Sequence, residues 1–142
     1  MAKMYKKNLD DVILRFRING VSLKDSDWVD VDILITSPVI SYNLKDWECD
    51  GEILECIDMN DVDALMEKWM SGSMTSIEEY ETVEPDLLLR FYPGEEKKID
   101  FCVCLQSKKF VFSSNYIVLP LEGKDAVEFV EYWKKAKANL KN

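Results

Sequence analysis

The chain has 142 residues, a length typical of one domain, and 47% of them are hydrophobic, which excludes an intrinsically disordered chain. Its formal net charge at pH 7 is −9, but residues 21–104 contain 21 acidic and six basic residues, a balance of −15. An acidic centre of this kind repels nucleic acids and anionic lipids and attracts basic partners, so neither nucleic-acid nor membrane binding is expected.

The N-terminal lysines are not followed by an apolar stretch, which argues against a signal peptide. No apolar run approaches the roughly 18 residues that a membrane-spanning helix needs. We therefore expect a cytoplasmic protein.

The first predicted element is a strand. Residues 1–11 follow no hydrophobic period, and we expect them to form an extension or flexible arm of a single domain that spans residues 1–142. Residues 12–18 (VILRFRI) alternate apolar and polar side chains, which is typical of a half-buried strand. Asn19 and Gly20 follow, and this dipeptide favours a tight type I′ turn.

Two further strands and a helix come next. Residues 27–37 (DWVDVDILITS) alternate aliphatic and mostly polar side chains, and residues 39–47 (VISYNLKDW) form another strand-like run. After Asp58 or Asn60, either of which can cap a helix, the period becomes that of an amphipathic helix ending at Gly72. Its predicted buried stripe consists of Val62, Leu65, Met66, Trp69 and Met70.

Strand patterns return in the second half. Residues 77–83, 87–92 and 98–106 each predict a strand, and residues 109–120 predict one or two more. A C-terminal helix is predicted at about residues 124–140. Its buried stripe consists of Ala126, Phe129, Val130, Trp133 and Ala136. The predicted fold is α+β, with a mainly antiparallel curved sheet or β-sandwich of about seven strands, one inserted helix and one C-terminal helix.

The sequence contains no histidine, which removes the commonest general base and the commonest metal ligand. There is also no glycine-rich nucleotide-binding motif, so we expect neither an enzyme nor a cofactor. The spacing of the four cysteines is not that of a usual zinc site, and no metal is expected. We expect ordinary reduced thiols at Cys49, Cys56, Cys102 and Cys104.

Acidic residues cluster in two predicted strands. Residues 77–86 contain five carboxylates and no basic residue, and residues 25–32 (DSDWVDVD) alternate acidic residues with Val and Trp. A glycosidase needs two carboxylates facing each other across a cleft, and a calcium loop needs a Gly for its turn. Neither segment fits these patterns. Two interpretations remain, a surface that receives a basic partner, or an edge strand that its charge keeps from aggregating.

Four features combine into a recognisable order: LRFRING followed by DSDWVDVDILI, the helix DVDALMEKWMSG, the segment VEPDLLLRF, and the amphipathic C-terminal helix. Together they resemble the WapI-like immunity proteins of bacterial polymorphic toxin systems. The likeness spans roughly residues 12–140 and rests mainly on apolar patterns, on Asp27-Trp28 and on Glu84-Pro85.

The resemblance implies a small cytoplasmic protein that binds and neutralises the C-terminal toxin domain encoded beside it. Such toxins are often nucleases, whose basic face an acidic protein can occupy. The partner-binding residues are expected in the two acidic strands. They are Asp27, Trp28, Asp30, Asp32, Glu78, Glu79, Glu81 and Glu84.

Two other functions stay open. A carbohydrate-binding or small-ligand-binding module on a β-sandwich needs exposed aromatic side chains in a row. Candidates for that row are Trp28, Tyr42, Trp47 and Tyr80. An accessory protein without enzymatic activity has the same sequence pattern.

Overall fold

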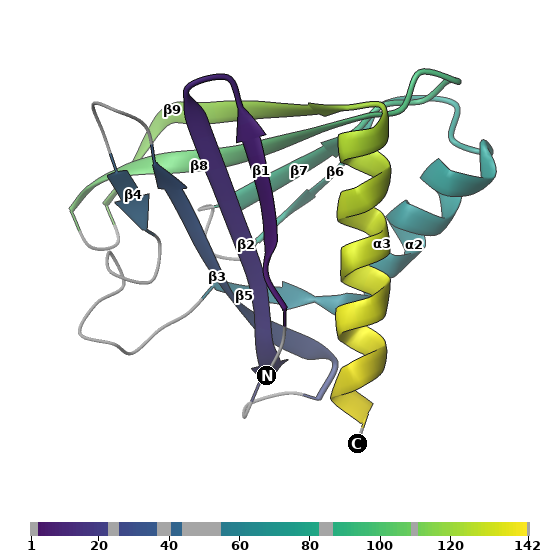
Figure 1. Cartoon of the computed structure of the whole chain (residues 1–142), viewed down its shortest axis with the longest axis horizontal. Coiled ribbons are helices and arrows are strands. Elements are labelled where there is room, and N and C mark those ends of the chain that lie inside the picture. The colour runs from purple at the N-terminus through teal and green to yellow at the C-terminus, as the bar shows by residue number, and fades with distance from the viewer. Residues whose placement is uncertain are drawn as a thin grey trace. The chain divides into compact units, whose positions relative to one another are not determined.

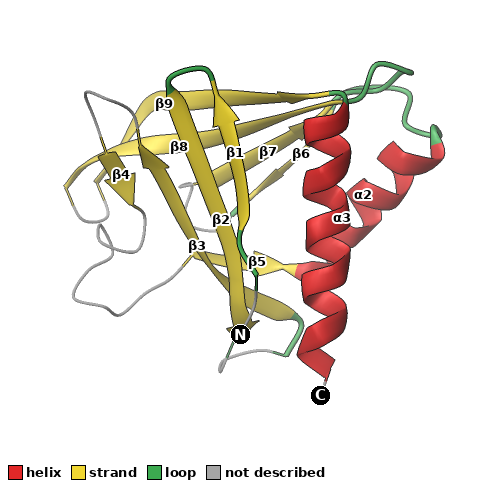
Figure 2. Cartoon of the chain, viewed as in Figure 1, coloured by secondary structure: helices red, strands yellow, loops and turns green. Residues whose placement is uncertain are grey.

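The computed structural model describes residues 3–22, 26–36, 41–43, 55–82, 87–108 and 111–141. These residues form nine strands in two sheets, together with two α-helices. Figure 1 labels these elements, and Figure 2 colours helices and strands separately. The predicted α+β class, with antiparallel sheets, one inserted helix and one C-terminal helix, is confirmed. The chain divides into two compact units. One combines the described residues of 1–57 with those of 131–142, and the other comprises those of 58–130.

The first unit contains a five-stranded sheet. Its order is β1-β2-β3-β4, and β5 also pairs with β3. The strands are β1 (Tyr5–Leu9), β2 (Val12–Val21), β3 (Trp28–Thr36), β4 (Ser41–Asn43) and β5 (Glu55–Asp58). Strand β3 alternates buried and half-buried side chains along its whole length, as its period predicted. Its buried residues are Val29, Val31, Ile33 and Ile35, which share the core with Leu14, Phe16 and Ile18 of β2.

The prediction that residues 1–11 form an extension is wrong for Tyr5–Leu9, which make strand β1. This strand pairs antiparallel with β2 from Tyr5 opposite Phe16 to Leu9 opposite Val12. Only Tyr5 of the strand is buried, because β1 lies at the sheet edge and most of its side chains are polar. An edge strand of this kind lacks the hydrophobic alternation by which strands are predicted.

The predicted turn at Asn19 and Gly20 is also wrong. Strand β2 continues to Val21, and its register with β3 shifts between Ile18 and Gly20, so that Asn19 is the extra residue of a β-bulge. The short turn with a positive φ lies instead after β1, at Asp10, whose φ is 56°. Aspartate tolerates this left-handed conformation better than most residues.

The second unit contains helix α2 (Met59–Ser71) and a four-stranded antiparallel sheet. The strands pair in chain order and are β6 (Glu78–Glu81), β7 (Leu87–Phe91), β8 (Lys98–Lys108) and β9 (Val111–Glu122). The ring of Trp69 from α2 packs edge-on against Phe91 of β7, with 6.3 Å between centroids. This contact fixes the buried side of the helix on one face of the sheet.

Both ends of α2 have the predicted caps. The carboxylate of Asp58 accepts hydrogen bonds from the backbone N–H groups of Asn60 and Asp61, and Gly72 closes the helix with φ 80°. Val62, Met66 and Trp69 are buried as predicted. Leu65 is only half-buried and Met70 is exposed, so the buried stripe is narrower than its period indicated.

Helix α3 (Lys124–Ala138) is the last α-helix of the chain and is followed by a 3₁₀ turn, Asn139–Lys141. All five residues of its predicted stripe are buried. Within the first unit, the ring of Tyr132 lies 6.0 Å from that of Tyr5 and 6.1 Å from that of Phe16. Its hydroxyl accepts a hydrogen bond from the Ile18 N–H and donates one to the Lys3 carbonyl. Burial raises the pKa of this phenol.

Two glycine substitutions test this description. Gly72→Ala should lower the free energy of unfolding by about 1 kcal/mol, because a Cβ is strained at positive φ. Gly20→Ala should leave stability unchanged or raise it slightly, because Gly20 does not have a positive φ and no atom lies within 4 Å of the added Cβ. Urea denaturation of both variants measures the difference. A loss at Gly20 equal to that at Gly72 would contradict the absence of a positive φ at Gly20.

Candidate functional site

An open groove of about 400 Å³ lies between helix α2 and strand β6, both in the second unit. We call it the acidic groove. It is lined by Asp61, Ala64, Leu65, Lys68, Glu78, Glu79, Tyr80 and Glu81. Four carboxylates and one ammonium group line it, which gives a formal charge of −3. Three of the eight predicted partner-binding residues therefore lie together here.

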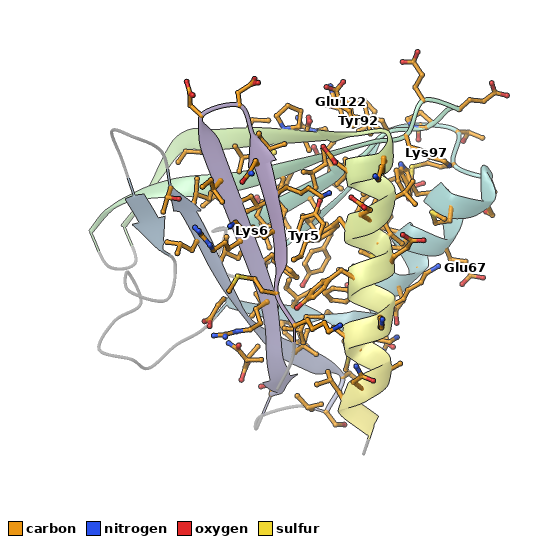
Figure 3. All side chains as sticks on the ribbon, in the orientation of Figure 1. Tyr5, Lys6, Glu67, Tyr92, Lys97 and Glu122 are labelled. Carbon is orange, nitrogen blue, oxygen red and sulfur yellow. The ribbon has the colours of Figure 1, made fainter. Side chains whose placement is uncertain are left out.

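The helix contributes one stripe to the groove. Asp61, Ala64, Leu65 and Lys68 follow the spacing i, i+3, i+4, i+7, which places them on one face of α2 beside the buried stripe. Glu67 is exposed and lies on the outward side of the helix, away from the strand, in Figure 3.

The strand contributes four consecutive residues. Side chains alternate along β6, so Glu79 and Glu81 are exposed, Glu78 is half-buried and Tyr80 is buried. Residues from both faces of a strand can line a single groove only at the strand's edge. Strand β6 is the edge strand of its sheet among the described residues. The acidic groove therefore follows that edge.

Two contacts from α2 to β6 hold the groove in shape. The backbone N–H of Asp58, the N-cap residue, donates a hydrogen bond of 2.9 Å to the hydroxyl of Tyr80. At the other end of the helix, the ammonium group of Lys68 lies 3.1 and 3.2 Å from the two carboxylate oxygens of Glu78. The start and the last turn of α2 are thus both tied to the strand.

A ladder of alternating charge crosses the face of the sheet opposite Tyr80, from the edge inward. Glu79 of β6 lies opposite Arg90 of β7, which lies opposite Asp100 of β8. Arg90 Nε donates a 2.7 Å hydrogen bond to Glu79, and Arg90 Nη1 lies 3.6 Å from Asp100. The hydrogen bond to Glu79 is the main cause that raises the pKa of Arg90.

The inner end of the ladder is buried. Asp100 is 4% exposed and accepts a hydrogen bond from the Tyr92 hydroxyl through one oxygen, while Lys98 Nζ lies 4.0 Å from the other. Lys98 also lies over the Tyr92 ring, 4.7 Å from its centroid. Beside Asp100 in the strand, burial raises the pKa of the Cys102 thiol to about 11, against a smaller lowering by Arg90.

A second hollow, of about 550 Å³, lies at the turn end of the same sheet, where Tyr92, Lys97 and Glu122 gather in Figure 3. It is also lined by Glu95 and Glu96. Lys97 donates a 2.7 Å hydrogen bond to the carbonyl of Trp69 and lies 4.8 Å from the centre of the Trp69 ring. In this hollow Lys97 therefore serves packing. The charged residues that line the hollow are three glutamates and two lysines, so its charge is mixed.

Four of the other predicted partner-binding residues belong to the first unit. Trp28, Asp30 and Asp32 lie on β3, an interior strand of its sheet, and Asp27 lies in the turn before it. Asp32 accepts a 2.8 Å hydrogen bond from Arg17 of β2. The structure therefore assigns the predicted set to two units. Glu84 lies outside the described residues.

The predicted row of aromatic side chains is not formed by all its members. Tyr80 is buried, with its hydroxyl bonded to α2, and Trp28 is half-buried. The side chain of Tyr42 and all of Trp47 lie outside the described part of the chain.

Sequence reasoning missed the cationic and helical parts of the site. Asp61 and Lys68 could have been found as a polar stripe next to the buried stripe of α2. Arg90 and Asp100 had no such signal, because only the register of three strands places them in line with Glu79. Pairing between distant segments cannot be read from the period of one segment.

Among the described residues, no three acidic or cysteine side chains are placed to hold a metal ion together. Neither described helix has the length and hydrophobicity to cross a bilayer. Cys102 is a buried free thiol, and the side chains of the other three cysteines lie outside the part that the structure describes.

Comparison with known proteins adds no relative, since no protein-family model, no curated protein and no solved structure matches this chain.

The environment of Cys102 predicts a pH dependence. An unfolded cysteine ionises with a pKa of about 8.5, whereas the folded thiol ionises only near 11. The unfolded chain therefore releases this proton first, and the free energy of unfolding should fall between about pH 9 and pH 11. Urea titrations at several pH values across this range give the free energy of unfolding of wild type and of Cys102→Ala. The effect of the thiol is the difference between the slopes of the two free energies against pH. Equal slopes would contradict it.

Proposed function

We propose that this chain is a cytoplasmic, non-enzymatic immunity protein that binds and neutralises a basic toxin domain through the acidic groove. The observation that carries the proposal is the position of Glu78, Glu79 and Glu81, which line one groove at a sheet edge together with Asp61. The resemblance to WapI-like immunity proteins, which rests mainly on apolar patterns, on Asp27-Trp28 and on Glu84-Pro85, also supports it.

The charge of the groove supports a protein partner. Its formal charge of −3 sits in a protein whose net charge is −9, so the surrounding field also attracts cations. A nuclease toxin presents a basic face to the phosphates of its substrate. An acidic groove that occupies this face blocks the substrate and accelerates the encounter of the two proteins.

The arrangement of the carboxylates supports recognition rather than catalysis. Glu78 and Glu79 are ion-paired with Lys68 and Arg90, and Glu79 and Glu81 are exposed. A carboxylic acid catalyst instead needs an apolar wall that keeps its proton. The sequence also contains no histidine that would serve as a general base near neutral pH.

The groove is a better docking site than strand β3. Strand β3 is flanked by β2 on one side and by β4 and β5 on the other, so its backbone is not at an edge. Its Asp32 is only 16% exposed and is paired with Arg17. The charges of β3 therefore lie in the interior of their sheet rather than at its edge.

Neutralising the groove should slow binding. The triple variant Glu78→Gln, Glu79→Gln and Glu81→Gln should associate about tenfold more slowly with the toxin domain encoded beside this chain at low salt. The difference between the association rates of the variant and of wild type should become smaller as the salt concentration rises, because the Debye length falls to about 3 Å at 1 M. Stopped-flow fluorescence over a salt series measures both effects, and survival of toxin-expressing cells measures neutralisation.

A matched control removes three charges elsewhere in the same unit. Glu95→Gln, Glu96→Gln and Glu122→Gln change the net charge equally but lie on the second hollow. The proposal requires a smaller effect from this control than from the groove variant. A parallel variant with Asn at Asp27, Asp30 and Asp32 tests strand β3. Loss of binding only in that variant would move the docking site away from the groove.

A further inference from the structure

Strand β6 directs part of its backbone away from its sheet. The Thr82 N–H donates a 3.1 Å hydrogen bond to the Leu87 carbonyl, so this pair belongs to the hydrogen-bonded pairs of the β6–β7 ladder. Such pairs alternate along antiparallel strands. Counting back by two, Tyr80 and Glu78 also face β7, and the backbone N–H and C=O of Glu79 point away from β7, toward the edge.

The pairing between β7 and β8 leads to the same result. The Tyr92 N–H donates a 3.2 Å hydrogen bond to the Lys98 carbonyl, which makes this pair a hydrogen-bonded pair between β7 and β8. Arg90, two residues earlier, therefore also directs its backbone groups to β8 rather than to β6. Glu79, directly opposite Arg90, then forms a non-hydrogen-bonded pair, in which side chains approach most closely. The 2.7 Å contact between these two side chains agrees with that.

The side-chain rows of the sheet end in negative charge at this edge. The row Glu79, Arg90, Asp100 alternates in sign from β6 inward, and the next row toward the end of β6 begins with Glu81. Opposite charges directly across neighbouring strands stabilise a sheet, whereas like charges destabilise it. A basic side chain opposite Glu79 on a strand added beside β6 would continue the alternation of the first row. A basic side chain opposite Glu81 would pair with that carboxylate, whose own row continues with the uncharged Leu88.

The other face of the edge has different requirements. Tyr80 and Glu78 point to the face on which α2 packs, and α2 presents Ala64 and Leu65 to the groove. Side chains of an added strand that lie opposite Ala64 and Leu65 meet a small residue and an aliphatic one, with Asp61 and the Lys68–Glu78 ion pair on either side. Uncharged, aliphatic side chains suit these positions.

We propose that β6 receives an extended segment of a basic protein partner as an added antiparallel strand, with Lys or Arg at alternate positions opposite Glu79 and Glu81 and aliphatic residues between them. The inference rests on the proposed function for the identity of the partner, which it specifies as a toxin domain with an exposed basic strand. Backbone hydrogen bonds at Glu79 supply the pairing, and the charge ladder supplies the specificity.

A synthetic peptide tests strand addition without the toxin. The probe is the acetylated and amidated heptapeptide Thr-Lys-Val-Arg-Val-Lys-Thr, titrated into the ¹⁵N-labelled full chain at low salt. The amide resonance of Glu79 should shift saturably, and its hydrogen exchange should slow, because its N–H gains a carbonyl acceptor. No binding, or binding without protection at Glu79, would overturn the proposal.

Two methylated peptides separate strand pairing from charge. N-methylation of the Arg and one Lys removes N–H groups that face β6 and should weaken binding about tenfold or more, the loss expected for one or two hydrogen bonds. N-methylation of the two Val residues removes N–H groups that face away and should have a much smaller effect. All three peptides have the same charge, so equal weakening by both modifications would mean that charge alone holds the peptide.

Two variants at one position repeat the test on the protein. Glu79→Pro removes the outward N–H, and proline is tolerated in an edge strand where that group faces solvent. Glu79→Gln removes the same charge but keeps the N–H. Binding should be lost in the proline variant and only reduced in the glutamine variant, with circular dichroism confirming the fold. If the proline variant does not fold, the binding of the methylated peptides to the wild-type chain still tells backbone pairing from charge alone.

Failure of the two proposals can be told apart. Loss of the peptide effects, with toxin-expressing cells still protected by the chain, overturns strand addition and leaves the immunity function. Peptide binding with the expected backbone dependence, without protection, overturns the immunity function and leaves a basic strand as the ligand of β6.

Discussion

The hydrogen bond from the Asp58 backbone N–H to the Tyr80 hydroxyl determines where helix α2 begins relative to strand β6. The same Asp58 caps the helix with its carboxylate, and Tyr80 is buried on the core face of the sheet. Helix start and sheet edge are therefore set by one pair of residues. The Trp69–Phe91 ring contact then fixes the rotation of the helix, and the acidic groove is the space that these constraints leave.

The charged residues around the groove contribute little to stability, and their proposed role in recognition depends on how they are arranged. Exposed ion pairs such as Lys68–Glu78 are worth about 0–1 kcal/mol in folding, because water screens them and ordering long side chains costs entropy. Their arrangement still has consequences. Arg90 holds Glu79 in a defined position at the edge, and buried Asp100 with Tyr92 holds the inner end of the same row. A partner thus meets an ordered charge rather than a mobile one.

The edge position also reconciles the two interpretations of the acidic strand. Charge at an exposed edge keeps identical chains from pairing, because two acidic edges repel each other. The same charge favours a basic edge from a different protein. Protection against self-association and the proposed selection of a basic partner would therefore both follow from one feature, the acidic ends of the rows that begin at Glu79 and Glu81.

The sequence by itself determined the α+β class, the alternation of β3, the C-cap of α2 at Gly72, its start near Asp58 or Asn60, and the buried stripe of α3. Each is a property of one segment, where a period of two or of 3.6 residues reports which side chains are buried. It did not determine strand β1, whose polar edge lacks such a period, or the bulge at Asn19, which depends on pairing with β3. Only the tertiary structure decided that α2 borders β6, that Arg90 and Asp100 line up with Glu79, and that the predicted acidic residues fall into two units. The reason is physical, since register and neighbours arise from contacts between distant segments that no single segment encodes.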